Sequence, residues 1–173
     1  EFIPYLIDRF HPDYIVGSVH FVDDMGFDYS QEQYDQTVEA AGGIEPMYCK
    51  YFDKQFEMIE LLKPSVVGHF DLIRIFDPGY KERILQPEIM DRIKRNLQLI
   101  GELDLIMDFN LRSLLKGADE PYISRVILEM AVEQGISVVP GDDSHGLSSI
   151  GANMDKWVAV LDQLGCNTNW KVP

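Results

Sequence analysis

The sequence is poor in cysteine and in basic residues. Cys49 and Cys166 are the two cysteines among 173 residues, too few for a disulfide framework and without the spacing of a metal site. Two such thiols fit a reducing compartment best, and we expect a cytoplasmic protein. Lys and Arg number 15 against 29 Asp and Glu, so the net charge is −14. A nucleic-acid partner needs a basic surface, and this charge argues against one.

Long apolar runs are also missing. No segment approaches the ~18 consecutive apolar residues of a membrane span, and none resembles a secretory signal, so we expect no membrane association. The sequence contains no Gly-x-Gly-x-x-Gly dinucleotide motif and no Walker phosphate loop. Residues 141–146 hold Ser144 between two glycines, but this serine follows a carboxylate pair and lacks the spacing of a hydrolase elbow. A serine nucleophile there is therefore a weak hypothesis.

What the sequence does contain is the composition of a globular domain. Hydrophobic residues make up 46% and aromatic residues 11%, which is enough for a sizeable core. We therefore predict a single domain over residues 1–173. The first residue is Glu1 rather than Met, and an apolar, aromatic segment follows at once, whereas natural N-termini are more often polar. We expect the chain to be the C-terminal portion of a longer protein.

Strand-like and helix-like segments alternate along the chain. Short apolar runs predict four strands, at residues 13–19, 65–68, 104–109 and 136–140. Amphipathic periodicity, capping residues and turn residues predict helices at residues 6–10, 30–40, 45–62, 87–100, 121–135 and 153–164. This alternation predicts an α/β fold with parallel strands that are covered by helices.

Each predicted strand is followed by polar side chains. In chain order these are Ser18 and His20, His69 and Asp71, Asp108 and Asn110, and Asp142, Asp143 and His145. In a (β/α) barrel the active site lies at the carboxyl ends of the strands. Four consecutive units of this kind predict part of a barrel, since a complete one usually needs roughly 250 residues and eight strands.

Three of the four histidines occupy these strand ends, and they are candidate metal ligands. His145 forms an Asp-x-His pair with Asp143, and His20 and His69 follow the first two strands. Imidazole and carboxylate ligands together suit Zn, Mn or Fe. A single histidine at a strand end is more often an ordinary hydrogen-bonded side chain, but three beside an Asp-x-His favour a metal site. We expect His11 to be a plain surface residue.

Arginines after the second and third strands are candidate phosphate ligands. Arg74 follows His69 by five residues, and Arg112 lies in the loop after the third strand. Each could bind a phosphate group through two hydrogen bonds, or form a surface ion pair with one of the many carboxylates. An acidic protein repels a phosphate ester, and divalent cations supply the positive charge that such a substrate needs.

Four motifs resemble one enzyme family. DYIVGSVHF at residues 13–21 and GHFDLIR at residues 68–74 are similar to two segments of the histidinol-phosphate phosphatases, in the polymerase and histidinol phosphatase (PHP) superfamily. DFN at residues 108–110, followed by KG at 116–117, resembles that family's acidic-x-Asn and Lys-Gly loop. DSH at residues 143–145 resembles its final Asp-x-His. The motifs occur in the family's order over nearly the whole chain.

The resemblance implies a fold, a reaction and a set of site residues. The fold is a distorted TIM-like (β/α)7 barrel, here without its N-terminal strands, whose carboxyl face holds two or three Zn, Mn or Fe ions. The reaction is hydrolysis of L-histidinol phosphate to L-histidinol and phosphate in histidine biosynthesis, by in-line attack of a metal-bound hydroxide on phosphorus. The implied metal ligands are His20, His69, Asp143 and His145, of which all but His69 are also expected to be catalytic. The implied substrate-binding residues are Arg74, Asn110 and Arg112.

The sequence departs from the family in two respects. The family's opening His-x-His, its next histidine and its bridging glutamate lie upstream of Glu1, which we do not assign as that glutamate. By itself the chain is expected to bind metal weakly and to have little activity. Many relatives carry arginine before the Lys-Gly loop where this chain has Leu115, so Arg112 is the candidate replacement. A PHP-type phosphoesterase with another phosphate ester, and an inactive fragment that binds metal or a partner chain, remain alternatives, and a homo-oligomer stays open.

Overall fold

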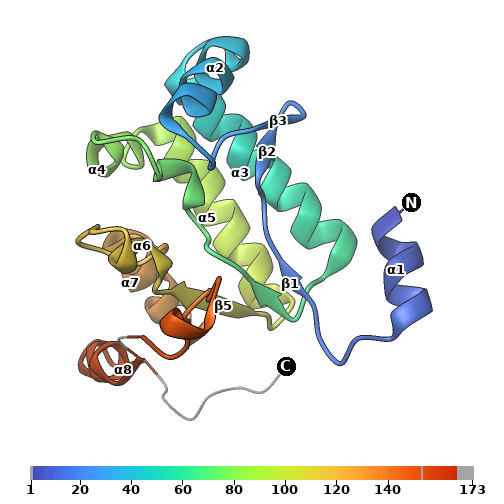
Figure 1. Ribbon diagram of the computed structural model, residues 1–173, viewed down its shortest axis with the longest axis vertical. Helices are drawn as coiled ribbons and strands as arrows, with labels where there is room; N and C mark the ends of the chain where they lie inside the picture. The colour runs from blue at the N-terminus through green and yellow to red at the C-terminus, as the bar shows by residue number, and fades with distance from the viewer. Residues whose placement is uncertain (1, 153, 167–173) are drawn as a thin grey trace.

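The computed structural model describes residues 2–152 and 154–166 (Figure 1). Its main sheet consists of β1 (Val16–Gly17), β4 (Val66–Val67), β5 (Ile106–Asn110) and β6 (Ser137–Gly141), in the spatial order β1-β4-β5-β6. All three pairings are parallel, and Val66 is aligned with Val16 on one side and with Ile106 on the other. The carboxyl ends of the strands therefore lie at one edge of the sheet. The predicted α/β fold with a parallel sheet is confirmed.

Within the described residues the sheet is open, because β1 and β6 each pair with a single neighbouring strand. The first predicted strand, residues 13–19, is shorter than expected and is regular only at β1. An antiparallel hairpin of β2 (Phe21–Val22) and β3 (Met25–Gly26) follows it, which the sequence pattern did not indicate. Asp23 and Asp24 form its turn with φ values of 49° and 64°, the left-handed backbone that a two-residue hairpin turn requires.

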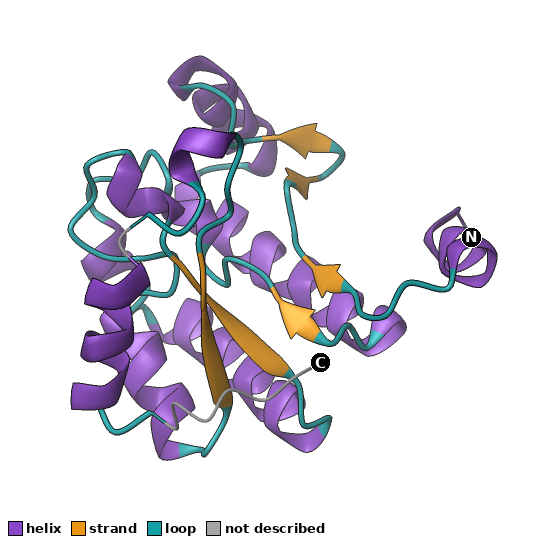
Figure 2. Ribbon diagram, turned by 60° about the horizontal axis from the view of Figure 1, so that its bottom comes forward, coloured by secondary structure: helices purple, strands orange, loops and turns teal. Residues whose placement is uncertain are grey.

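The helices lie before, between and after the strands. They are α1 (Phe2–Phe10), α2 (Gln31–Ala41), α3 (Ile44–Leu62), α4 (Tyr80–Arg83), α5 (Pro87–Glu102), α6 (Arg112–Leu115), α7 (Arg125–Glu133) and α8 (Met154–Gln163), with short 3-10 turns at η1 (Leu72–Arg74) and η2 (Leu147–Ser149). The long helices α3 and α5 pack against each other beside the strands (Figure 1). The N-terminal helix α1 stands apart from the rest of the chain in both ribbon views, and it contains no buried residue (Figure 2).

Several helix ends follow directly from the local sequence. Ser30 caps α2 by accepting a hydrogen bond from the Gln33 backbone N–H at 3.2 Å, and Gly42 ends that helix with φ 89°. Pro87 begins α5, as predicted. The helix predicted at residues 121–135 begins later, at Arg125, because Ser124 instead binds a distant carboxylate, that of Asp71.

A buried polar network anchors the segment that carries the second strand-end motif. Asn96 on α5 donates to the Phe52 carbonyl at 2.8 Å and to Gln55 Oε1 at 3.1 Å. Gln55 on α3 in turn donates to the Phe70 carbonyl at 2.8 Å, next to His69. A buried amide without a partner costs about 1–3 kcal/mol, so these bonds select one arrangement of α3, α5 and the loop after β4.

Neither cysteine forms a disulfide bond. Cys49 and Cys166 are free thiols that lie partly buried against the core, and burial raises the pKa of each. None of the helices in the described part of the chain has the length and apolar character needed to cross a membrane.

Candidate active site

A cavity of about 920 Å³ lies at the carboxyl edge of the sheet. The segments that follow all four strands contribute to it, as the strand-end polar residues predict. Its polar lining includes Ser18, His20, Asp28, His69, Asp108, Asn110, Arg112, Lys116, Asp142, Asp143 and His145. Six of the seven residues predicted for the site therefore face one cavity, and Arg74 is the exception.

His20 and His69 are in direct contact within this cavity. Their rings meet edge to face, with centroids 4.8 Å apart and an interplanar angle of 82°. His69 is only 7% exposed, and its Nδ1 is buried without a hydrogen-bond partner among the described residues. A buried polar atom of this kind is rare in folded proteins and points to an ion or ligand that it could bind.

The two imidazoles have opposite electrostatic environments. Burial, and to a lesser extent the neighbouring His20, lower the pKa of His69 to about 4. The pKa of His20 is raised, chiefly because its Nδ1 lies 2.8 Å from Asp28 Oδ2. The same contact lowers the pKa of Asp28. Near neutral pH His69 is therefore neutral, and one of its two ring nitrogens carries an available lone pair.

Asp108 lines the cavity as well, and like Asp28 it was not assigned to the site by the sequence prediction. Its Oδ2 accepts hydrogen bonds from Asn110 Nδ2 at 2.8 Å and, more weakly, from the His69 backbone N–H at 3.4 Å. Burial raises the pKa of Asp108 to about 6. Gly141 on β6 permits this placement, because a Cβ atom there would overlap Asp108 Oδ1.

Asp143 and His145 are more exposed residues of the cavity lining. The side chain of His145 is 62% exposed, and its Nδ1 donates a hydrogen bond to the Asp143 carbonyl oxygen at 2.8 Å. His69 and Asp143 both have positive φ values, 24° and 45°, a strained backbone for residues other than glycine. Within the described ranges, no three His, Cys, Asp or Glu side chains are close enough together to hold a metal ion.

Arg112 and Asn110 also line the cavity. The Arg112 backbone N–H donates to Asn110 Oδ1 at 3.1 Å, so Asn110 links Asp108 to the beginning of α6. Arg112 Nε is buried and has no hydrogen-bond partner among the described residues. Arg112 lines the cavity, and an unpaired guanidinium N–H suits an anionic ligand.

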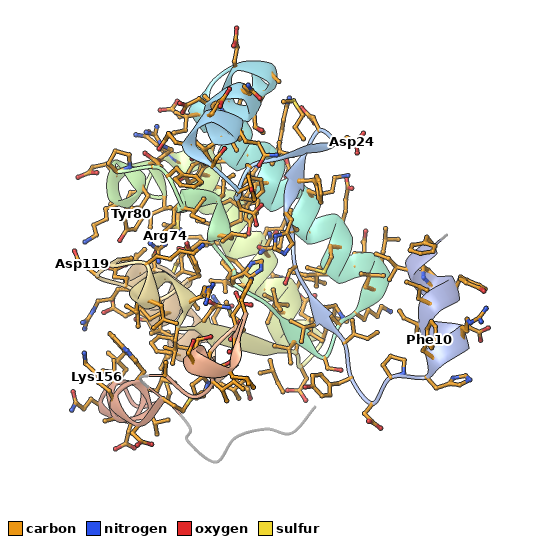
Figure 3. All side chains as sticks on the ribbon, viewed as in Figure 1. Phe10, Asp24, Arg74, Tyr80, Asp119 and Lys156 are labelled. Atoms are coloured by element: carbon orange, nitrogen blue, oxygen red, sulfur yellow. The ribbon has the colours of Figure 1, made fainter. Side chains whose placement is uncertain are left out.

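Arg74 lies in an adjoining hollow of about 490 Å³, which shares Asp28 and Lys116 with the main cavity. Its Nε donates to Asp71 Oδ2 at 3.2 Å, and its Nη2 donates to the carbonyls of Glu120, at 3.1 Å, and Pro121. The guanidinium also stacks between two tyrosine rings, one of which, Tyr80, is labelled beside it in Figure 3. Much of its hydrogen-bonding capacity is therefore used within the protein.

No family model matches the chain, but comparisons with known proteins find relatives. It is 32% identical over 168 residues to the probable histidinol-phosphatase of Schizosaccharomyces pombe, covering 95% of this chain and 55% of the relative. It is 31% identical over 166 residues to the histidinol-phosphatase of Saccharomyces cerevisiae, covering 83% of this chain and 50% of the relative. The chain is a histidinol-phosphatase homologue. It spans about half the length of these curated relatives.

A solved structure supports the same relationship at the level of the fold. The crystal structure of the "putative histidinol phosphatase hisK" from Listeria monocytogenes superposes with a TM-score of 0.81 at 29% identity. The match covers 90% of this chain and 62% of that one. The histidinol-phosphatase homologue thus has an α/β fold with a parallel sheet that matches part of a solved relative.

The donor types in the cavity of this homologue suit a divalent metal, although no three of them in the described ranges lie close enough together to hold one. Imidazole and carboxylate are the donor types that Zn, Mn and Fe accept, and the cavity presents both. The unpartnered Nδ1 of His69 is the strongest single indication, because a neutral buried imidazole nitrogen is a ready ligand.

Asp108 and Asp28 are among the cavity residues that the sequence prediction did not assign to the site. Asp108 was noted as a strand-end residue in an Asp-x-Asn motif, and that motif was a sufficient signal. Asp28 had no such signal, because it lies eight residues after His20 and reaches it through the unpredicted hairpin.

Proposed function

We propose that the protein is a metal-dependent phosphomonoesterase that hydrolyses L-histidinol phosphate to L-histidinol and phosphate. The observation that carries the proposal is the buried, unpartnered His69 Nδ1 beside His20, in a cavity at the strand ends of a histidinol-phosphatase homologue. The chain spans about half of its relatives, so the proposal concerns the activity of the whole protein.

Two or three divalent ions, Zn, Mn or Fe, form part of the proposal. Their proposed ligands in this chain are His20, His69, Asp143 and His145. Such ions would supply Lewis acidity and positive charge where the phosphoryl oxygens lie. The rest of the chain surrounds that position with carboxylates, so the substrate's own negative charge would otherwise be repelled.

The proposed substrate-binding residues are Arg112, Asn110 and Arg74. Arg112 is suited to donate from its unpaired Nε to a phosphoryl oxygen, which supports it as the replacement for the family arginine at the Leu115 position. Asn110 orients it, by accepting a hydrogen bond from the Arg112 backbone N–H. Arg74 would act from the adjoining hollow, where its side chain is already held by Asp71.

We further propose that residues 1–173 form one domain within a distorted (β/α)7 barrel. The open edges of the sheet support this, since β1 and β6 each have an unpaired side within the described residues and Val16 on β1 is 51% exposed. Unpaired strand edges normally acquire a neighbour or a cover.

The test measures hydrolysis of L-histidinol phosphate and of an aryl phosphate by the whole protein, with metal content determined by elemental analysis. We expect kcat/KM to favour histidinol phosphate by at least ~100-fold, because a site built to bind the substrate's polar groups discriminates strongly. Removal of metal by a chelator should abolish activity, and added Zn²⁺ or Mn²⁺ should restore it. Equal rates on both esters would favour a PHP-type enzyme with another substrate. Absence of any bound or activating metal would contradict both.

A further inference from the structure

His20 and His69 are the two proposed metal-binding histidines whose rings touch, and His20 makes a short polar contact with Asp28. Asp28 Oδ2 lies 2.8 Å from His20 Nδ1, and both residues line the cavity. Among the described residues, the Nδ1 of His69 has no hydrogen-bond partner. Asp28 therefore hydrogen-bonds to His20 and reaches His69 only through its charge.

The hairpin β2–β3 holds Asp28 in this position. Phe21 pairs with Gly26 and Val22 with Met25, so the chain returns alongside His20 after a two-residue turn. The Gly26 carbonyl accepts a hydrogen bond from Thr37 Oγ1 on α2 at 2.9 Å, which ties the returning strand to the body.

Phe27 directly precedes Asp28 in the chain. Its ring is fully buried and meets the ring of Tyr51 edge to face, with centroids 5.7 Å apart. Phe27 and Asp28 directly follow β3, and the buried Phe27 anchors the chain beside Asp28, which lines the cavity. The packing of the hairpin thus helps to hold Asp28 where it meets His20.

The two ring nitrogens of His20 consequently have different roles. A carboxylate accepts hydrogen bonds, so it stabilises the tautomer with the proton on Nδ1 and leaves the lone pair on Nε2. His145 has the same arrangement, since its Nδ1 donates to the Asp143 carbonyl. Histidines that bind metals usually donate their other ring N–H to a carboxylate or a backbone carbonyl.

The geometry points to Asp28 as a positioning residue, which holds the His20 proton on Nδ1 and so presents Nε2 to a divalent cation; this inference rests on the proposed function. Asp28 does not itself bind the ion in this arrangement. Its role is to orient the imidazole and to exclude the other tautomer.

The experiment uses Asp28→Ala and Asp28→Asn in the whole protein, with Asp24→Asn as the matched control. Asp24 belongs to the same hairpin but lies in its exposed turn, and asparagine tolerates its φ of 64°. The first readout is the His20 tautomer, from ¹⁵N NMR of metal-free protein at about pH 9, where imidazole is neutral. The second is the affinity for Zn²⁺ alone, measured by competition with a chelator.

We expect Asp28→Ala to move the His20 proton to Nε2 and to weaken Zn²⁺ binding by about 10–100-fold. Asp28→Asn should give a mixture of tautomers, because a neutral amide can accept from Nδ1 or donate to it. Asp24→Asn should match the wild type in both measurements.

A wild-type tautomer in Asp28→Ala, or unchanged Zn²⁺ affinity, would overturn the inference. A rise in KM for histidinol phosphate at saturating Zn²⁺, with tautomer and affinity unchanged, would overturn it in favour of direct substrate contact. Failure of the proposed function is separate: a wild-type protein that binds Zn²⁺ and shows the tautomer shift, but hydrolyses no histidinol phosphate, would contradict the proposed substrate and leave the positioning role in place.

Discussion

Asp77 and Asp108 are both carboxyl groups withdrawn from water, and their surroundings differ sharply. Asp77 is 5% exposed and accepts hydrogen bonds from Tyr48 Oη and the Gly79 N–H, each at 2.9 Å, and from Arg83 Nε. Burial by itself raises the pKa of Asp77, but these donors outweigh it and the pKa is lowered. Burial prevails at Asp108 and raises its pKa to about 6.

The difference separates a structural polar cluster from a functional one. The Asp77 cluster satisfies its charge within the protein, so it stabilises the fold and has little left to offer a ligand. The cavity leaves His69 Nδ1 and Arg112 Nε without partners among the described residues. Unsatisfied polar groups cost folding free energy, and they concentrate where a ligand can compensate for them. Substitutions in the cavity should therefore change activity, and substitutions around Asp77 should change stability.

The largest effect is expected at His145. We predict that His145→Asn in the whole protein lowers kcat by at least ~100-fold and depletes bound metal, since losing a metal ligand removes several kcal/mol of transition-state stabilisation. The melting temperature should stay near that of the wild type, because the side chain is 62% exposed. His11→Asn, at an exposed position outside the cavity, is the control. Near-normal turnover in His145→Asn would remove it from the site.

The next effect is on stability. Asp77→Asn should lower the free energy of unfolding by about 2 kcal/mol, because it removes a charge-assisted hydrogen bond to Arg83 within a buried cluster. Asp53→Asn, which breaks more exposed ion pairs with Arg92 and Arg95, should cost less than ~1 kcal/mol. Urea denaturation measures both. Equal losses would show that burial of the Asp77 cluster contributes nothing beyond a surface ion pair.

Arg112 and Arg74 extend the comparison to the cations. Arg112→Ala should raise KM for histidinol phosphate by about 10-fold, the loss of one charged hydrogen bond, with little change in stability. Arg74→Ala should weaken substrate binding while metal content stays normal, and it should also lower stability, because Arg74 bonds to Asp71 and to two backbone carbonyls. Steady-state kinetics and thermal melts separate the two patterns. A stability loss confined to Arg112→Ala would reverse these assignments.

The smallest effect is a difference in pH dependence in the metal-free protein. The lowered pKa of Asp77 means that its stabilisation is present above the unfolded value of about 4 and is lost as the pH falls through the folded value. The raised pKa of Asp108 has the opposite sign: the penalty for ionising it develops between about pH 4 and 6 and is complete above pH 6.

Denaturation curves of two variants at pH 3 to 8 check this contrast. The deficit of Asp77→Asn relative to the wild type should shrink toward low pH. Asp108→Asn should gain stability relative to the wild type above about pH 6 and lose that gain toward pH 4. Parallel curves for the two variants would contradict the contrast between the carboxyl groups.

Much of the architecture was predictable because it depends on local pattern. The caps at Ser30 and Gly42 and the proline at the beginning of α5 define helix ends through contacts within a few residues. The four strands were recognisable as apolar runs, and the polar residues at their ends, apart from the fully buried Asp71, do share one cavity. The late beginning of α7 was not predictable, because it depends on Asp71, which is 53 residues from Ser124.

The candidate site divides in the same way. The sequence by itself determined which residues are available at the strand ends, because parallel strands bring their carboxyl ends to one edge. Only the tertiary structure decided which groups are paired there. It buried the Nδ1 of His69 without a hydrogen-bond partner among the described residues, brought Asp28 to His20 through a hairpin, and engaged Arg74 with backbone carbonyls. Burial and long-range hydrogen bonding depend on the packing of segments far apart in the chain, and no local pattern of residues contains that information.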